Sequence, residues 1–325
     1  MANILVTGGA GYIGSTTCKY LYTQGHQITV YDNLTTGHRN LVKFGDFVKG
    51  DLEDTEALTR EMRLRKIDGV IHFAAKAYVG ESVVKPALYY HNNVFGTISL
   101  LAAMKAADVH KLVYSSTCAV YGQPKQLPIV ESTPLNPINP YGSSKAMVEK
   151  ICNDVSLAHG LSTVTLRYFN ACGTEKELEV GERHDPEPHL IPRILMAAAG
   201  DLKNLEIYGD DYDTPDGTCI RDYVHVSDLA SAHSLAYDYL SGGGASFTCN
   251  LGTGRGLSVH ELLEVAERIT GKKIPVTYVP RRPGDPAALV ADAQLAAEIL
   301  RWSPEHSESD NIIKTAWDWY QKERS

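Results

Sequence analysis

A tyrosine and a lysine in the middle of the chain have the spacing of a general acid–base pair. The run from Pro140 opens a helical pattern in which Tyr141 and Lys145 lie one turn apart on the same face. An ammonium group beside a phenol stabilises the phenolate, so we expect the pKa of Tyr141 to lie below its usual ~10. Tyrosine can then accept a proton near neutral pH. Chance and packing also produce this spacing, so the pair needs a structural context.

Hydroxyl side chains supply that context. Ser115, Ser116 and Thr117 close an apolar run at 111–116 that predicts a buried strand. Ligands of doubly wound sheets bind at the carboxyl ends of the strands, so this is where a substrate is expected. Thr117 can hydrogen-bond a substrate hydroxyl there and relay its proton. Thr117, Tyr141 and Lys145 are therefore the predicted catalytic residues.

A glycine-rich loop follows the first expected strand and opens a helix. Gly8, Gly11 and Gly14 have the spacing G-x-x-G-x-x-G. A Cβ there would obstruct the turn, the approach of a pyrophosphate and helix–strand packing. The N–H groups at the start of the helix favour phosphates. The loop therefore predicts a dinucleotide site.

An acid at the end of the second expected strand selects the dinucleotide. Asp32 is placed to hydrogen-bond the ribose hydroxyls and would repel a 2′-phosphate, so we expect NAD rather than NADP. Arg39 lies nearby in the sequence, where it can meet a phosphate, but a surface role is the better interpretation.

Strand and helix patterns alternate over the first half of the chain. This alternation predicts an α/β protein with a Rossmann-type, doubly wound parallel sheet. After about residue 170 the segments become shorter and more polar, which predicts a smaller, mixed C-terminal substrate region. We expect an NAD-binding domain at 1–170 and a substrate-binding region at 171–325, with some segments returning to the first domain. The expected strands are 3–7, 27–32, 47–51, 69–74, 111–116 and 163–169, and the expected helices are 11–24, 54–66, 87–107, 141–159 and 190–200. The later short segments, separated by turns, are 205–209, 221–226, 248–251 and 276–280.

Composition excludes several classes of protein. The 325 residues carry a net charge of −8 without a basic block, so nucleic acid is not an expected partner. No apolar run approaches the ~20 residues that span a bilayer, and no signal-peptide pattern precedes the first strand, so we expect a cytoplasmic protein without a membrane partner. The six cysteines are scattered, and we expect neither disulfides nor a metal site.

Motifs along almost the whole chain resemble those of the extended short-chain dehydrogenase/reductase family, and most closely its nucleotide-sugar 4-epimerase branch. Several of the motifs lie on the substrate side, so the resemblance is far more specific than the glycine loop. They are TGGAGYIG at 7–14, YDNL at 31–34, HFAA at 72–75, VGES at 79–82, YYHNNV at 89–94, SSTCAVYG at 115–122, PYGSSK at 140–145, RYFN at 167–170, DGTCIRDYVHV at 216–226, NLGTG at 250–254 and RRPGD at 281–285.

The resemblance assigns further residues to two ligands. His189 stands where relatives often have Asn, and Arg221 and Arg282 are suited to bidentate pairing with a diphosphate. Beside Gly8, Gly11, Gly14 and Ser115 in the loop and strand, the cofactor contacts are expected from Tyr12, Ile13, Asp32, Asn33, Asp51, Leu52, Phe73, Ala74, Asn93, Tyr141, Lys145 and Phe169. The UDP-sugar contacts are expected from Thr117, Tyr141, Asn170, His189, Leu190, Tyr208, Arg221, Arg282, Asp285 and Leu289.

The implied activity is the NAD-dependent interconversion of UDP-galactose and UDP-glucose, by transient oxidation at the sugar C4, rotation of the 4-keto sugar and return of the hydride. Nucleotide-sugar dehydratases carry an Asp-Glu pair where this chain has Cys118 and Ala119, and UDP-glucuronate decarboxylases usually carry Glu at the second position, so both fit poorly. A 4-epimerase of UDP-glucuronate or a UDP-pentose stays open, as does a non-catalytic NAD-binding sensor of the same fold.

Two finer expectations concern specificity and assembly. Branch members restricted to unmodified hexoses often have Tyr where Leu289 stands, so the smaller leucine predicts some activity on UDP-GlcNAc and UDP-GalNAc. The resemblance also implies a homodimer formed by the helices at 87–107 and 141–159. Apolar residues on the second helix either form that interface or face the sheet; they are Met147, Val148, Ile151 and Val155.

Overall fold

The computed structural model describes residues 1–282 and 285–325. Arg281, Arg282 and Asp285 of the RRPGD motif are therefore described, whereas its Pro283 and Gly284 lie outside the described residues.

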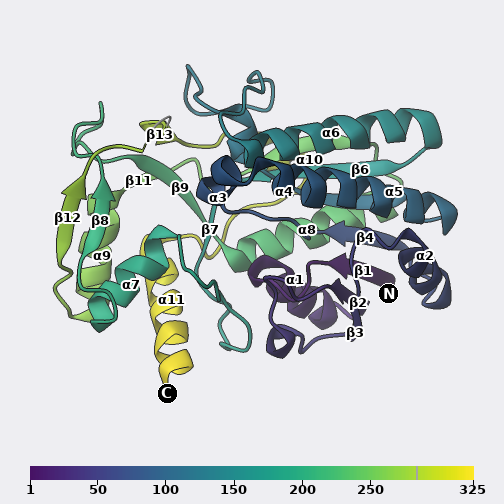
Figure 1. The fold of residues 1–325 in the computed structure, drawn as a ribbon, viewed down its shortest axis with the longest axis horizontal. Helices are drawn as coiled ribbons and strands as arrows, with labels where there is room; N and C mark the ends of the chain where they lie inside the picture. Colours follow the sequence, from purple (N-terminus) through teal and green to yellow (C-terminus); the bar gives the residue numbers. More distant parts are fainter. Residues whose placement is uncertain (283–284) are drawn as a thin grey trace.

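A seven-stranded parallel sheet forms the centre of the protein (Figure 1). Its strand order is β10-β6-β5-β4-β1-β2-β3, so the winding direction reverses between β1 and β4. Ile4 and Val6 of β1 face one apolar core and Leu5 faces the other, which explains why the strands are apolar on both sides. The strands are β1 (Asn3–Thr7), β2 (Gln27–Asp32), β3 (Asp46–Lys49), β4 (Gly69–His72), β5 (Lys111–Thr117), β6 (Ser162–Tyr168) and β10 (Phe247–Leu251).

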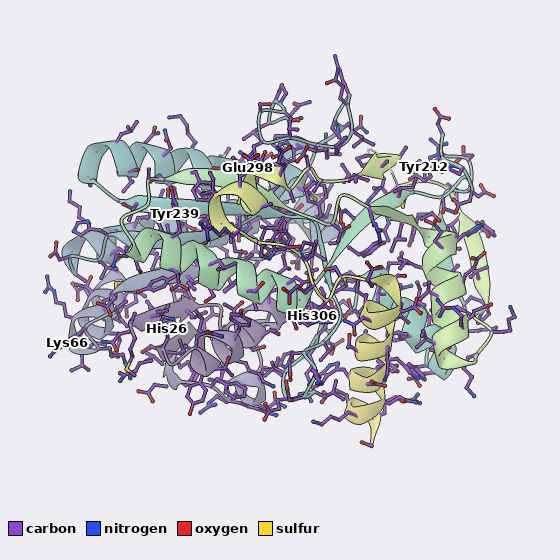
Figure 2. All side chains as sticks on the ribbon, turned by 180° about the vertical axis from the view of Figure 1, so that it is seen from behind. His26, Lys66, Tyr212, Tyr239, Glu298 and His306 are labelled. Carbon is purple, nitrogen blue, oxygen red and sulfur yellow. The ribbon has the colours of Figure 1, made fainter. Side chains whose placement is uncertain are left out.

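Helices cover both faces of this sheet, which confirms the predicted doubly wound α/β fold. On one face α1, α8 and α10 share a core, and Tyr239 and Glu298 mark α8 and α10 in the view from behind (Figure 2). On the other face α2, α5 and α6 share a second core. The helices are α1 (Tyr12–Thr23), α2 (Thr55–Leu64), α5 (Gly96–Ala106), α6 (Pro140–His159), α8 (Val226–Ser241) and α10 (Gln294–Leu300), with a short α3 (Val79–Val84) and a 3-10 turn η1 (Arg39–Leu41).

The helix expected at 87–107 is interrupted. The chain forms α4 (Pro86–Tyr89), a π-helical turn η2 (Tyr90–Phe95) and then α5. Asn93 in the wide turn accepts a hydrogen bond from the backbone N–H of Lys76 at 2.8 Å and donates to Ser144 Oγ at 3.0 Å. These bonds to two other segments lie beyond the reach of a periodicity argument and accompany the local change of helix type.

The C-terminal half builds a second, smaller layer and also returns to the first. Helices α7, α9 and α11 pack in their own apolar core beside the short strands. Strand β10 joins the central sheet beside β6, and α8 packs on α1. The remaining elements are β7 (Asn170–Cys172), β8 (Leu205–Tyr208), β9 (Ile220–His225), β11 (Gly256–Ser258), β12 (Val276–Val279), β13 (Ala288–Leu289), η3 (Cys118–Tyr121), α7 (Leu190–Ala199), α9 (Val259–Thr270) and α11 (Ser309–Arg324).

Within residues 1–282 and 285–325, no helix combines the length and the apolar character that a bilayer span needs.

The first turn after β1 is extremely crowded. Gly8 has a φ of +73°, and a Cβ at this residue would lie 2.5 Å from the backbone nitrogen of Ala74. A Cβ at Gly14 would lie 2.3 Å from the carbonyl oxygen of Gly8. Backbone atoms cannot swing away as side chains do, so glycine is required at both positions.

We predict that Gly8→Ala lowers the free energy of unfolding by more than Gly25→Ala does. Both glycines have a positive φ, which costs alanine about 1–2 kcal/mol. Gly25 has open space around its Cβ position, whereas Gly8 adds overpacking of about 1–3 kcal/mol. Urea denaturation of the two variants measures the difference. Equal losses would show that the crowding at Gly8 is relieved without cost.

Candidate active site

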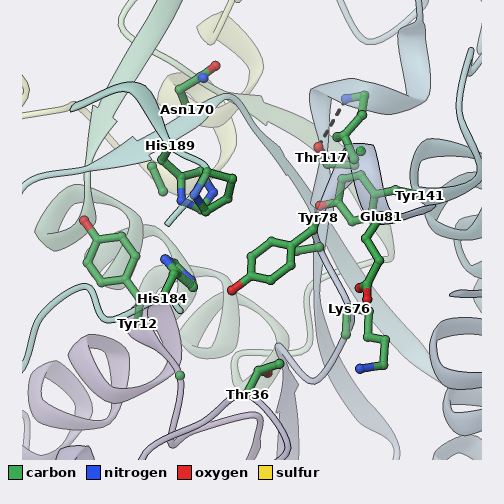
Figure 3. Close-up of a pocket in the computed structure, with 18 of the residues that line it drawn as sticks. Tyr12, Thr36, Lys76, Tyr78, Glu81, Thr117, Tyr141, Asn170, His184 and His189 are labelled. Carbon is green, nitrogen blue, oxygen red and sulfur yellow. Dashed lines mark hydrogen bonds between the residues drawn. The ribbon is translucent and has the colours of Figure 1, made fainter. Parts of the chain in front are cut away.

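A cavity of about 870 Å³ runs along the carboxyl edge of the central sheet (Figure 3). The register of the parallel strands places the ends of β1, β4, β5 and β6 at this edge. All but three of the predicted site residues line it. They are Gly8, Gly11, Tyr12, Ile13, Gly14, Asp32, Asn33, Asp51, Leu52, Phe73, Ala74, Thr117, Tyr141, Phe169, Asn170, His189, Leu190, Tyr208, Arg221, Arg282, Asp285 and Leu289.

The other three predicted residues, Asn93, Ser115 and Lys145, lie behind the cavity wall. The polar atoms of the Asn93 side chain bond to Lys76 and Ser144. The Ser115 hydroxyl shares a 2.7 Å hydrogen bond with the hydroxyl of Tyr168, which does line the cavity. These residues therefore support wall residues in this structure.

The glycine loop presents the amino end of α1 to the cavity. Gly11 is the N-cap of this helix and has no side chain to accept the first N–H groups, while Tyr12, Ile13 and Gly14 line the cavity. Such a helix end attracts a phosphate through its N–H groups and its dipole.

Asp32 ends β2 and contacts the glycine loop. Its two carboxylate oxygens accept backbone N–H bonds from Ala10 at 3.0 Å and Leu34 at 2.8 Å. Burial raises the pKa of Asp32, and these two hydrogen bonds counteract the rise. The bonds fix the orientation of the carboxylate and leave further lone pairs for hydroxyl groups.

Tyr141 and Thr117 lie together in the cavity, where Figure 3 shows both side chains. Burial raises the pKa of the Tyr141 phenol well above its usual value, and a side-chain hydrogen bond with Thr117 is the influence that lowers it. The Thr117 oxygen itself accepts from the N–H of Ala119 at 3.1 Å. Thr117 therefore has a fixed orientation and a proton to donate to the phenol oxygen.

The predicted influence of Lys145 on the Tyr141 pKa is wrong for this structure. Lys145 Nζ donates to the carbonyl oxygen of Ser115 at 2.8 Å. Burial lowers the pKa of Lys145 to about 7, although the carboxylate of Glu149 opposes this change. In the low-dielectric interior, desolvation of both groups therefore outweighs the attraction that the i, i+4 spacing suggests.

The buried carboxylate of Glu149 is itself held by an ion pair. Arg167 Nη2 lies 2.5 Å from Glu149 Oε2, and both side chains are 8% exposed. Ser116 Oγ donates to the other oxygen of Glu149. The helix α6 that carries Tyr141 and Lys145 is thus fastened to β5 and β6.

On the other side of the cavity the two predicted arginines differ. Arg221 donates to the carbonyls of Ile220 and Pro286 and forms a 2.5 Å ion pair with Asp285, so its guanidinium is engaged by the protein rather than open to bidentate pairing. The guanidinium of Arg282 instead lies 4.0 Å from the centre of the Tyr208 ring. Among the described residues, no carboxylate lies within ion-pair distance of Arg282.

Two glutamates and two histidines form a cluster on the loop before α7, namely Glu182, His184, Glu187 and His189. Of these four residues, the sequence predicted only His189 as a site residue. Hydrogen bonds with Glu182 and Glu187 outweigh the effect of burial and raise the pKa of His184 to about 9 and that of His189 to about 10. For Glu187, burial acts to raise the pKa, but the two histidines lower it to about 2. The signal that was available is the spacing E-x-H-x-x-E-x-H at 182–189.

The cavity also has contacts that tie its two sides together. The Tyr12 hydroxyl in the glycine loop donates to the carbonyl of Gly173 at 2.5 Å. Two turns further along the same face of α1, Lys19 lies 2.6 Å from Glu175 and pairs with two more glutamates of the following loop. The loop between β7 and α7 is thereby docked on the first helix of the Rossmann unit.

Fold and cavity together define a doubly wound α/β protein with a dinucleotide loop and a polar second subsite at the same sheet edge. The sequence profile of the NAD dependent epimerase/dehydratase family matches residues 4–252. The chain belongs to this family.

Relatives with nearly the same length support this assignment. The chain is 49% identical to a UDP-glucose 4-epimerase of Halalkalibacterium halodurans over 319 residues, which cover 98% of this chain and 96% of the relative. A crystal structure of UDP-glucose 4-epimerase from Brucella ovis in complex with NAD is 54% identical, with a TM-score of 0.96 and 98% coverage of both chains. The structure of the UDP-Glc/GlcNAc 4-epimerase from Campylobacter jejuni is 39% identical, with a TM-score of 0.87, and the match covers 99% of this chain and 100% of that one.

Proposed function

We propose that the protein is an NAD-dependent isomerase that interconverts UDP-glucose and UDP-galactose. The observation that carries the proposal is a single cavity that joins the glycine loop, the Thr117–Tyr141 pair and the arginine–tyrosine stack of Arg282 and Tyr208. The names of the similar proteins, UDP-glucose 4-epimerase in each closely related case, support the same activity.

The loop residues fit NAD. Because Gly8 and Gly14 have no side chains in this crowded turn, the N–H groups at the start of α1 are accessible to a pyrophosphate. The carboxylate of Asp32 has a fixed orientation in which it can accept hydrogen bonds from ribose hydroxyls. The same negative charge would repel the extra phosphate of NADP. When bound, NAD supplies hydride acceptance from the sugar C4 and hydride return to it.

Tyr141 handles the proton of the sugar 4-hydroxyl in this proposal. Its phenolate oxygen accepts that proton during oxidation and returns it during reduction. Thr117 donates a hydrogen bond that stabilises the phenolate against the burial that disfavours it. Lys145 acts from behind the wall, where it orients the end of β5 through Ser115.

Epimerisation requires the 4-keto sugar to present its other face, so the nucleotide must stay bound while the hexose turns. The Arg282 guanidinium supplies a cation for the diphosphate, and its stacking on Tyr208 restricts its position. Binding energy at the nucleotide, remote from C4, then holds the substrate during the turn.

Dehydration is disfavoured by the wall beside Thr117. Cys118 is buried there, and burial raises the pKa of its thiol to about 12, so it stays protonated. Ala119 has no proton to exchange. Neither residue can replace an acid–base pair that acts at C5 and C6.

The function is tested by incubating the purified protein, without added NAD, with UDP-Gal, UDP-GalNAc, UDP-GlcA or UDP-Xyl. NMR of the products identifies each C4 epimer. We expect UDP-Glc as the main product, from UDP-Gal. Turnover of UDP-GlcA or UDP-Xyl alone would reassign the substrate, and no turnover with bound NAD would indicate a sensor of the same fold.

For the general base, we predict that Tyr141→Phe lowers turnover by at least about 10²-fold, within the ~10²–10⁴-fold range of general-base catalysis. The change removes the hydroxyl but keeps the ring, so NAD retention should persist. Tyr22→Phe, at an exposed tyrosine, is the control. Near-normal epimerisation by the Tyr141 variant would refute its assignment.

For the cofactor, acid-quenched protein should release NAD rather than NADP. We predict that Asp32→Ala weakens NAD retention and narrows the preference over NADP, because ribose acceptors and the repelling charge are both lost. Asp46→Ala, at an acid of the neighbouring strand β3, should retain NAD. Chromatography of the released nucleotide measures both variants, and mostly NADP in the unchanged protein would contradict the proposal.

Leu289 is proposed to limit the size of the group at the sugar C2. It lies in β13, opposite Arg221 in the strand pairing, and packs with Cys118 and Phe169 while lining the cavity. A leucine here leaves more space than a tyrosine, which supports a side activity on UDP-GlcNAc and UDP-GalNAc. The name of the Campylobacter jejuni relative agrees with such a dual range.

We therefore predict that Leu289→Tyr lowers kcat/KM for UDP-GlcNAc at least about 10-fold more than for UDP-Glc, since the acetamido group exceeds the single methylene that is worth ~1–3 kcal/mol. Leu289→Met, which conserves volume, should keep the ratio. Steady-state kinetics on both substrates decides the point. Equal losses, or no N-acetylhexosamine activity at the outset, would exclude this role.

A homodimer and a cytoplasmic location are part of the proposal. Val148 of α6 is buried against the sheet, but Met147 beside it is exposed, as are Phe95 at the end of η2 and Ile98 in α5. We propose that these three exposed apolar side chains contribute to the surface that meets a second copy, and sedimentation equilibrium measures the association. We further propose that 1–170 mainly holds NAD and that 171–325 mainly holds the UDP-sugar.

A further inference from the structure

Four potential metal ligands meet on the loop between β7 and α7. Donor atoms of Glu182, His184, Glu187 and His189 all lie within 4.8 Å of one another. Figure 3 shows His184 between Tyr12 and Tyr78, with His189 nearby. The centroids of the two imidazole rings are 4.7 Å apart.

The donors alternate around a closed ring. His184 Nδ1 lies 3.1 Å from an oxygen of Glu182 and 3.4 Å from an oxygen of Glu187. His189 Nδ1 lies 3.1 Å and 2.7 Å from oxygens of the same two carboxylates. Tetrahedral zinc with bonds of about 2.0–2.2 Å needs donors roughly 3.3–3.5 Å apart. The four histidine–glutamate separations of 2.7–3.4 Å would have to stay or widen slightly, and the histidine–histidine and glutamate–glutamate separations, which are within 4.8 Å, would have to shorten by about 1.4 Å at most.

The two buried carboxylates of this ring require positive charge nearby. The Glu182 and Glu187 side chains are only 11% and 10% exposed. Within the described residues, the only ion-pair partners of these carboxylates are the two histidines. Two buried negative charges must be neutralised, either by one proton on each imidazole or by one divalent cation between the four groups.

The chemistry of the donors selects the cation. Two imidazoles and two carboxylates suit Zn²⁺ better than Mg²⁺ or Ca²⁺, which prefer oxygen ligands alone. Glu182, His184 and His189 line the large cavity, so an ion can enter from it. Four protein ligands complete a tetrahedral shell, which is the arrangement of a structural site rather than a catalytic one.

We propose that Glu182, His184, Glu187 and His189 form a structural Zn²⁺ site that closes the loop between β7 and α7 over the edge of the cavity. The expectation of no metal site rested on the cysteines, and this cluster contains none. The inference is independent of the proposed epimerase activity, because its test does not measure turnover.

The test uses the full chain, treated with a chelator, dialysed and titrated with Zn²⁺ or Co²⁺ in mildly alkaline buffer. We expect one tightly bound equivalent of Zn²⁺, the visible absorption of tetrahedral Co²⁺, and a rise in Tm with Zn²⁺ because the ion binds the folded state. His184→Asn and Glu187→Gln should each weaken binding by more than the ~10–100-fold typical of a residue that only supports a ligand.

The matched control is His91→Asn. His91 and Glu53 form an exposed pair 2.9 Å apart, with the same two donor types but only two donors, so this variant should keep the full equivalent. Near-ultraviolet circular dichroism reports whether each variant folds. If one ligand variant fails to fold, the other variant and the unchanged protein still decide the question. No stoichiometric binding by the unchanged protein, or binding that survives either ligand substitution in a folded variant, would overturn the proposal in favour of a ring held by two protons.

Discussion

The contact between the backbone of Gly8 and the first turn of α1 is the constraint on which the rest of the site depends. Because no side-chain atom fits between Gly8, Gly14 and Ala74, helix α1 begins directly at the edge of the sheet. That position brings the Tyr12 hydroxyl to Gly173 and Lys19 to the glutamates of the loop after β7. The same helix packs against α8 on the other side. One close approach therefore aligns the glycine loop, the loop between β7 and α7, and helix α8.

Burial governs the electrostatics of Tyr141 and Lys145, the residues proposed for catalysis. It raises the pKa of Tyr141 and lowers that of Lys145, so each group is pushed toward its neutral form. In such surroundings a single hydrogen bond has a large effect, which gives the one from Thr117 to Tyr141 its importance. The Glu149–Arg167 pair serves a different purpose, because it holds α6 against β5 and β6 and leaves the cavity free of its charges.

The features that could be predicted from the sequence are those encoded by neighbouring residues. Strands such as β1 and β2 are apolar runs with clear ends, and the glycine loop joins one of them to a helix, so their positions agreed closely. The clustering of Thr117 and Tyr141 followed from the rule that parallel strands end at one edge. The partner of Arg221 is different. Asp285 lies on a distant segment, and nothing in the pattern around Arg221 distinguishes an internal ion pair from a ligand contact. The π-helical turn at Asn93 and the acid–histidine ring before α7 likewise depend on contacts between segments, or on loop geometry that periodicity does not describe.

The position of β10 makes the two halves of the chain inseparable. This strand comes from the second half yet occupies the outer edge of the central sheet, beside β6, and α8 comes from the same half yet covers α1. A fragment that stops near residue 170 would expose the hydrogen-bonding edge of β6 and the apolar surface beneath α8. Open strand edges of this kind recruit other chains, so the isolated first half would be expected to aggregate. Exchange of the second half between relatives would then have to carry β10 and α8 along, so a change of specificity is expected from substitutions at single cavity residues rather than from replacement of a module.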